Sequence, residues 1–128
     1  MKNRNLVHSD NWATPKDLYD LLNIEFNFDF DPCPPNPKFD GLAITWGLVN
    51  FINPPFKDIS KWVAKTYAEV MCGRTCVLLI PSRTDTRWWH DFCMKATEIR
   101  FIKGRLHYDD SKNPAPFPSC LVIFDNRQ

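Results

Sequence analysis

Glycine is scarce in this chain, and features that define several protein classes are missing. There are 4 glycines against 11 prolines in 128 residues, so we expect short elements joined by stiff, well-defined loops. No run approaches the roughly 20 apolar residues of a membrane span, and the polar first ten residues lack the apolar core of a signal peptide. The composition therefore predicts a cytoplasmic protein in a reducing compartment.

Paired cysteines and a strong net charge are also lacking. The 5 cysteines form no Cys-x-x-Cys pair, whereas a zinc site usually brings closely spaced ligand pairs. We therefore expect free thiols and no metal. The formal net charge of +1 argues against a polybasic DNA coat, because a protein that holds DNA through phosphates alone is normally more basic. The same totals are compatible with a local basic face, since 16 Lys and Arg are offset by 15 acids.

The length fits one domain, and we expect residues 1–11 to be a flexible segment and residues 12–128 to form a single domain. Thr14-Pro15 predicts a helix start, with a hydroxyl at the N-cap and proline at the first helical position. Residues 26–31 alternate apolar and polar, which predicts a strand with its three phenylalanines on one face. The prolines between positions 32 and 37 then enforce a stiff loop.

The rest of the chain alternates strand and helix patterns. Strands are predicted at residues 48–52, 76–80, 98–102, 104–108 and 119–124, and helices at residues 58–71, with Gly73 as a cap, and 84–95. The uniformly apolar segment 76–80 is typical of the middle of a parallel sheet, and segments 104–108 and 119–124 are expected to pair. This order predicts a compact, three-layer α/β domain, with a mixed central sheet flanked by helices.

Asn53-Pro54-Pro55-Phe56, directly after a predicted strand, is the most informative feature. The amine of an aromatic ring is a poor nucleophile, because its nitrogen lone pair is delocalised into the ring. Two acceptors that bond to its two N–H groups favour lone-pair density on the nitrogen, directed at an electrophile. The Asn53 side chain and the Pro54 backbone offer two such carbonyl oxygens. The prolines fix the turn, and Phe56 offers a face on which an extruded base can stack. The alternative is a proline-rich turn with Asn53 bonded locally and Phe56 in the core.

The tetrapeptide resembles the signature of N6-adenine and N4-cytosine DNA methyltransferases, written as Asp or Asn, Pro, Pro, then Tyr, Phe or Trp. Over roughly residues 12–124 the chain resembles, more closely, the small phage-type DNA N-6-adenine-methyltransferases. The further matching segments, in chain order, are Trp12-Ala13-Thr14-Pro15, Phe30-Asp31-Pro32-Cys33, Leu79-Ile80-Pro81-Ser82-Arg83-Thr84-Asp85-Thr86 with Trp88-Trp89, and Gly104-Arg105-Leu106.

The resemblance implies a minimal Rossmann-like methyltransferase domain that transfers a methyl group from S-adenosylmethionine to the N6 amine of adenine in DNA. It also implies a phage- or prophage-encoded protein of a bacterial cell. The implied catalytic residues are Asn53, Pro54, Pro55 and Phe56. The residues implied to bind the cofactor are Trp12, Thr14, Pro15, Asp31, Cys33 and Asn53.

Several of these cofactor residues have a purely structural alternative. Asp31 can be a turn-forming aspartate, Thr14 a simple N-cap and Trp12 a packing anchor. Against that, Asp31 ends one predicted strand and Asn53 directly follows another, and ligands of open α/β sheets bind at the carboxyl ends of strands. The chain departs from many methyltransferases in having prolines where they have a glycine-rich cofactor loop. Asp40 is a ribose-binding candidate by proximity alone.

Lys57, Arg83, Arg87 and Arg105 are the predicted contacts to DNA phosphates, each with a solvated or salt-bridged cation as its alternative. Trp88 and Trp89 are adjacent on a predicted helix and point in different directions, so at least one is expected in the core. Two rival functions remain: a methyltransferase acting on RNA or a protein amide, and a non-catalytic nucleic-acid-binding relative of the fold.

Overall fold

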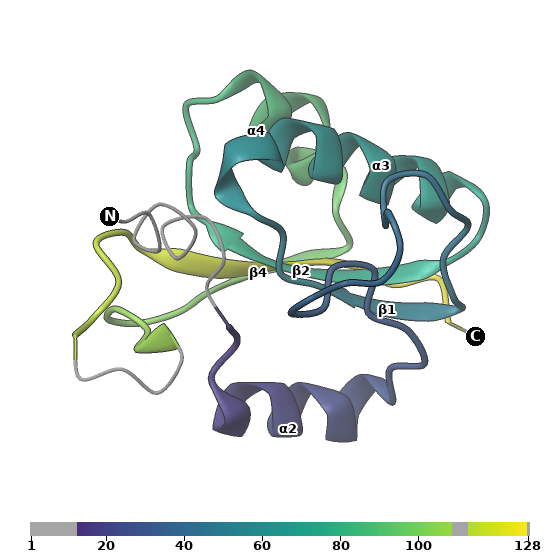
Figure 1. Ribbon diagram of the computed structural model, residues 1–128. Helices are drawn as coiled ribbons and strands as arrows, with labels where there is room; N and C mark the ends of the chain where they lie inside the picture. Colours follow the sequence, from purple (N-terminus) through teal and green to yellow (C-terminus); the bar gives the residue numbers. More distant parts are fainter. Residues whose placement is uncertain (1–12, 109–112, 128) are drawn as a thin grey trace, which may run out of the picture.

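The computed structural model describes residues 13–108 and 113–127. The expected flexible segment 1–11 and Trp12 lie outside the described residues. In the described part the chain forms three layers, with a central sheet covered by α3 and α4 on one face and by α2 on the other (Figure 1). The helices are α2 (Lys16–Phe26), α3 (Ile59–Met71) and α4 (Arg87–Asp91), and the strands are β1 (Val49–Ile52), β2 (Thr75–Pro81), β3 (Glu98–Phe101) and β4 (Ser119–Phe124). The predicted α/β class, with a mixed sheet flanked by helices, is confirmed.

The sheet has the order β1-β2-β4-β3 and mixes both strand directions. β1 and β2 are parallel, whereas β4 runs antiparallel to both of its neighbours. The expectation that segment 76–80 is covered on both faces is confirmed, since every residue of β2 is buried. Its expected place in the middle of a parallel sheet is wrong, because the C-terminal strand β4 returns antiparallel beside it.

Alternation along β2 divides the core between the two faces. Cys76, Leu78 and Ile80 pack with residues of α3 and α4, whereas Val77 and Leu79 pack with residues of α2. Both clusters consist mainly of large apolar side chains, and removing such side chains from water is the main driving force of folding. Because both faces are covered, the sheet holds its strand ends in fixed positions.

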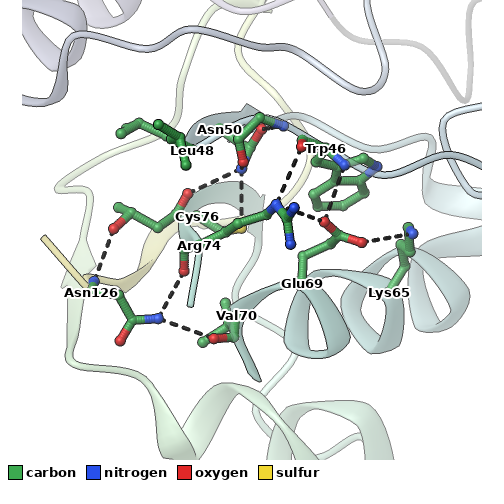
Figure 2. Close-up of polar contacts among 12 residues, drawn as sticks. Trp46, Leu48, Asn50, Lys65, Glu69, Val70, Arg74, Cys76 and Asn126 are labelled. Carbon is green, nitrogen blue, oxygen red and sulfur yellow. Dashed lines mark hydrogen bonds and ion pairs between the residues drawn. The ribbon is translucent and has the colours of Figure 1, made fainter. Parts of the chain in front are cut away.

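Helix α3 follows a short 3-10 turn, η1 (Phe56–Asp58), and ends as predicted. Gly73 has φ +96° and its N–H donates to the carbonyl of Val70, a left-handed conformation that glycine adopts without penalty. A polar network fastens the amino ends of β1 and β2 to this helix (Figure 2). Its centre is Glu69, a buried residue that accepts hydrogen bonds from Lys65 and from the backbone N–H of Trp46.

The predicted strand at residues 26–31 is wrong except for one bridge. Phe26 ends α2, and Asn27 takes a left-handed conformation with φ 54° that stops the helix. Phe26 and Phe28 pack in the α2 cluster, whereas Phe30 packs on the α3 face, so the three rings do not share a face. Only Phe30 pairs with β1, in a parallel bridge to Asn50. The helix and its cap override the alternating pattern.

The predicted strand at residues 104–108 is also wrong. Gly104 has φ +77°, which turns the chain out of the sheet, and the antiparallel partners of β4 are β2 and β3. The predicted helix at residues 84–95 is shorter than expected. It consists of α4, capped by the Thr86 side chain, followed by the 3-10 turn η2 (Cys93–Lys95).

Candidate functional site

The Asn-Pro-Pro-Phe segment leaves the carboxyl end of β1 and leads into η1 and α3. The bridge between Phe30 and Asn50 runs parallel to β1, so Asp31 lies at the same end of the sheet as Asn53. Pro81 ends the neighbouring parallel strand, β2. These three chain segments therefore meet at one edge, as expected for ligand sites of α/β sheets.

Asn53 is held by a residue 39 positions earlier in the chain. Its side-chain Nδ2 donates to Oγ1 of Thr14 at 3.0 Å, and its Oδ1 is buried. The prediction that Thr14 caps the helix is wrong. The N-cap residue of α2 is Pro15, and no side chain caps this helix, so proline is not at the first helical position either. The Thr14 hydroxyl orients the amide of the motif instead.

Cys33 contacts the same turn from the proline-rich loop. Its Sγ donates to the backbone carbonyl of Asn53 at 3.2 Å, and its N–H donates to Oδ1 of Asp31 at 3.0 Å. Burial raises the pKa of the thiol well above its usual range, the charge of Asp31 raises it further, and the Asn53 contact opposes both. A protonated thiol is a donor, so Cys33 supports the turn and is not a nucleophile.

Asp31 is a half-buried carboxylate. Burial raises its pKa above the ordinary value, and the N–H of Cys33 partly offsets that effect. Among the residues that the structure describes, no Lys or Arg forms an ion pair with it. Tyr19, on α2, lies close enough for the Asp31 charge to raise the tyrosine pKa, after the larger effect of burial. Sequence reasoning missed Tyr19, although it lies one helical turn after Pro15.

A pocket of about 260 Å³ borders the Asn-Pro-Pro-Phe turn at Phe56. It is lined by Phe56, Ile59, Pro81, Arg83, Thr86 and Trp88. Phe56 is the motif residue in this lining, and Asn53 is not part of it. The ring of Phe56 also packs edge-on against Phe117, with centroids 5.0 Å apart and planes at 85°. Phe56 is therefore anchored in the core on one side and borders the pocket on another.

The four predicted DNA-contacting cations are all exposed. Arg83 lines the pocket, Lys57 follows Phe56 in η1, and Arg87 is the first residue of α4, next to Trp88. Arg105 follows Gly104 in the loop after β3, and no contact within the described ranges joins it to the pocket. Arg83 therefore lies in the pocket lining, and Lys57 and Arg87 lie next to lining residues in the chain.

The proline-rich loop closes without the glycines that many methyltransferases have. Asn36 takes a left-handed conformation, with φ 51°, which asparagine tolerates better than most residues. Gly41 lies so close to the loop that an added Cβ would be 1.9 Å from the carbonyl oxygen of Pro32. Asp40 is exposed and accepts the N–H of Leu42, as a turn-forming aspartate does.

The site contains a thiol, that of Cys33, and a carboxylate, that of Asp31, which accepts the backbone N–H of Cys33. Within residues 13–108 and 113–127, no group of three His, Cys, Asp or Glu side chains is placed to hold a metal ion. All five cysteines are present as free thiols. No helix in these ranges has both the length and the apolar character required to span a membrane.

The fold and the site together have the features of one class: α/β proteins with an Asn-Pro-Pro-aromatic turn at the carboxyl end of a strand, as in the DNA amino-methyltransferases. A family model described as DNA N-6-adenine-methyltransferase (Dam) matches residues 3–124. The chain belongs to this family. No curated protein and no solved structure matches it.

Proposed function

We propose that this protein transfers a methyl group from S-adenosylmethionine to the N6 amine of adenine in DNA. Residues 12–128 would act as one Rossmann-like methyltransferase domain, in a bacterial cell and encoded by a phage or prophage. The family match supports the reaction class. The observation that carries the proposal for the site is the hydrogen bond from Asn53 Nδ2 to Thr14 Oγ1, because it supports an arrangement in which the protein holds the amide nitrogen and the amide oxygen would accept from a substrate.

The amide and the turn would act by accepting hydrogen bonds. Since Thr14 accepts the N–H of Asn53, the side-chain carbonyl, whose oxygen is buried in this structure, would be the end that accepts from a substrate amine. The backbone carbonyl of Pro54 is the second acceptor, and the two prolines restrict its direction. Two acceptors for the two amine protons keep the nitrogen lone pair out of the ring and directed at the methyl donor. This is positioning and electrostatic stabilisation, without a covalent intermediate on the protein.

The residues near Asn53 fit a cofactor that carries positive charge. When bound, S-adenosylmethionine supplies an electrophilic methyl group on a cationic sulfur, and it also carries an ammonium group. Asp31 is a carboxylate in a partly buried position where its charge is disfavoured, and a cation nearby would stabilise it. Thr14, Pro15 and Cys33 lie at the same edge of the sheet, and Trp12 joins them by resemblance. Lys57, Arg83, Arg87 and Arg105 would contact DNA phosphates.

The test is the Asn53→Ala variant, assayed for N6-methyladenine by digestion and mass spectrometry of PCR-amplified DNA, which carries no methyl groups. We expect at least about a 100-fold loss of rate, as for the loss of one stabilising donor or acceptor at a reacting centre. Circular dichroism should show an unchanged fold. Thr14→Val should lower the rate less, and Thr14→Ser, which keeps the hydroxyl, should restore it.

Parallel incubations with RNA and with protein separate this proposal from its rivals. Label transferred to RNA or protein, and not to DNA, would contradict the substrate assignment. Binding of S-adenosylmethionine without transfer to any pool would favour the non-catalytic alternative. An Asn53→Ala variant as active as the unmodified protein would refute the role given to the amide.

A further inference from the structure

The pocket beside the motif has a second aromatic wall, to which the proposed chemistry gives no role. Trp88 borders this pocket together with Phe56 and with the apolar side chain of Ile59. The volume of about 260 Å³ is slightly below the roughly 300–1,000 Å³ of sites for drug-sized ligands. It therefore suits a ligand of the size of one nucleobase. An aromatic lining favours such a ligand because every base has a π-face on which to stack.

The two adjacent tryptophans of α4 differ in their surroundings. Trp89 is only 2% exposed and belongs to the α3-side core, so the prediction that at least one of the pair is in the core is confirmed. Trp88 is half-buried, packs against this core with one part and borders the pocket with another. Burial of Trp89 fixes the rotation of α4 about its axis, and that rotation directs Trp88 to the opening.

The segment that carries Trp88 is held in place by local hydrogen bonds. The Thr86 hydroxyl donates to the carbonyl of Arg83 at 2.8 Å and accepts the N–H of Trp89 at 3.3 Å. Nε2 of His90 lies 2.8 Å from the carbonyl oxygen of Thr84 and donates to it. The wall is therefore formed before any ligand arrives, which lowers the entropy lost on binding.

We propose that Trp88 is a base-contacting residue, which forms with Phe56 the pocket that receives the target adenine outside the DNA helix. This inference rests on the proposed function and assigns Trp88 a role in substrate binding. Bases taken out of a duplex are held by stacking between aromatic or apolar side chains. Arg83, in the same lining, would lie beside the phosphate of the extruded nucleotide. Asn53 lies outside this lining, three positions before Phe56 in the same turn.

The test compares Trp88→Leu with Trp88→Phe in steady-state methylation of PCR-amplified DNA. Trp88→Leu keeps an apolar side chain and removes the aromatic face, so kcat/KM for DNA should fall about 5- to 100-fold, as when a base-stacking ring is lost. Trp88→Phe should recover most of the rate. The dissociation constant for S-adenosylmethionine, measured by calorimetry, should be the same in both variants, because the cofactor residues lie outside this lining.

Phe92→Leu is the matched control. Phe92 is a half-buried aromatic residue just after α4, and it packs against Tyr67 of α3, away from the pocket. Its replacement tests whether the loss of any aromatic ring near α4 lowers the rate. The kcat/KM for DNA should be unchanged in this variant. If the unmodified protein methylates DNA and Trp88→Leu keeps its full kcat/KM, the role given to Trp88 is wrong and the proposed function is unaffected. An unmodified protein that methylates no DNA would overturn the proposed function and this inference with it.

Discussion

Asp31 is a single residue whose charge conflicts with its surroundings. Burial raises its pKa, only the N–H of Cys33 counters that effect, and no ion pair with a described Lys or Arg relieves it. Because the pKa is higher in the folded than in the unfolded chain, ionisation of Asp31 lowers the free energy of unfolding. That cost is absent below the ordinary value of 3.8 and is complete above the folded value. A residue kept at such a cost is expected to serve binding.

We therefore predict opposite effects of Asp31→Asn on stability and on cofactor affinity. At pH 7 the thermal midpoint should rise, because asparagine keeps the acceptor for Cys33 and carries no charge. This difference should disappear as the pH falls toward 3.8. The affinity for S-adenosylmethionine should fall about 10-fold or more, since a hydrogen bond to a charged group contributes roughly 1.5–3 kcal/mol. Thermal scans over pH and calorimetry measure the two effects.

Asp40→Asn is the control for Asp31→Asn, because Asp40 lies in the same loop and is exposed. It should change neither quantity, since its bond to the N–H of Leu42 can be made by asparagine as well. Unchanged cofactor affinity in Asp31→Asn would show that this carboxylate does not face the ligand. Weakened affinity in Asp40→Asn would instead support its role at the ribose.

At the scale of elements, a single carboxylate of α3, that of Glu69, contacts residues that precede both parallel strands, β1 and β2 (Figure 2). Glu69 accepts from Lys65 Nζ at 2.9 Å and from the Trp46 N–H at 3.1 Å, and Arg74 Nε lies 3.4 Å away. Burial alone would raise the pKa of Glu69, but these contacts outweigh burial and lower it. A lowered pKa means that the contribution to stability is complete above the ordinary value of 4.5 and is lost as pH falls through the folded value.

Glu69→Gln should therefore lower the free energy of unfolding at pH 7 by about 1–3 kcal/mol, since it leaves buried donors poorly matched. Urea titrations should show that the difference from the unmodified protein shrinks below pH 4.5, where Glu69 itself becomes protonated. Glu98→Gln is the control, because Glu98 is exposed and solvent screens its pair with Arg100. An equal loss in both variants, or a loss independent of pH, would contradict the role of the network.

The elements also show what periodicity can predict and what it cannot. Segments 48–52, 58–71, 76–80, 98–102 and 119–124 are predicted within a residue or two, because their apolar patterns match the faces that the core buries. Segment 26–31 fails because a left-handed Asn27 ends α2 inside it. Segment 104–108 fails because Gly104 turns the chain away from the sheet. Backbone conformation at one residue decides both cases, and side-chain patterns do not encode it.

The candidate site is only partly predictable for a related reason. Asn53 follows a strand that the sequence predicts correctly. Asp31 and Cys33 are brought to the same end of the sheet by a single bridge between Phe30 and Asn50, not by the strand predicted at residues 26–31. The partnership of Asn53 with Thr14 crosses 39 positions and competes with a local cap, which sequence reasoning favours. The role of Trp88 depends on which of two adjacent tryptophans enters the core, and only the packing of α4 decides that.

At the scale of the whole molecule, the net charge is +1, but the cationic side chains differ in whether they form ion pairs. Arg74, Arg100 and Arg127 form ion pairs with acidic side chains, whereas Arg83 is an exposed residue of the pocket lining. Binding of DNA releases about one counterion for each phosphate that a cation neutralises. A modest salt dependence, set by a few cations near the pocket, follows from this distribution.

Arg83→Gln should therefore reduce the slope of log affinity for DNA against log salt concentration by about 0.9. Fluorescence anisotropy with a labelled duplex, at several salt concentrations, measures this slope. Arg100→Gln is the control, since Arg100 lies on the far edge strand β3 and is already paired with Glu25 and Glu98. If the slope falls equally in both variants, DNA binding depends on the total charge of the protein and not on the cations around the pocket.

The hydrogen bond between Thr14 and Asn53 joins the residue that precedes the N-cap of α2 to the proposed reaction centre. The Thr14 hydroxyl thereby restricts the rotation of the Asn53 amide. If Asn53 acts as proposed, a purification tag or a deletion close to Thr14, near the amino terminus, would change the reaction as well as solubility. Anyone preparing this protein for assay has reason to leave that terminus unaltered and to modify the other.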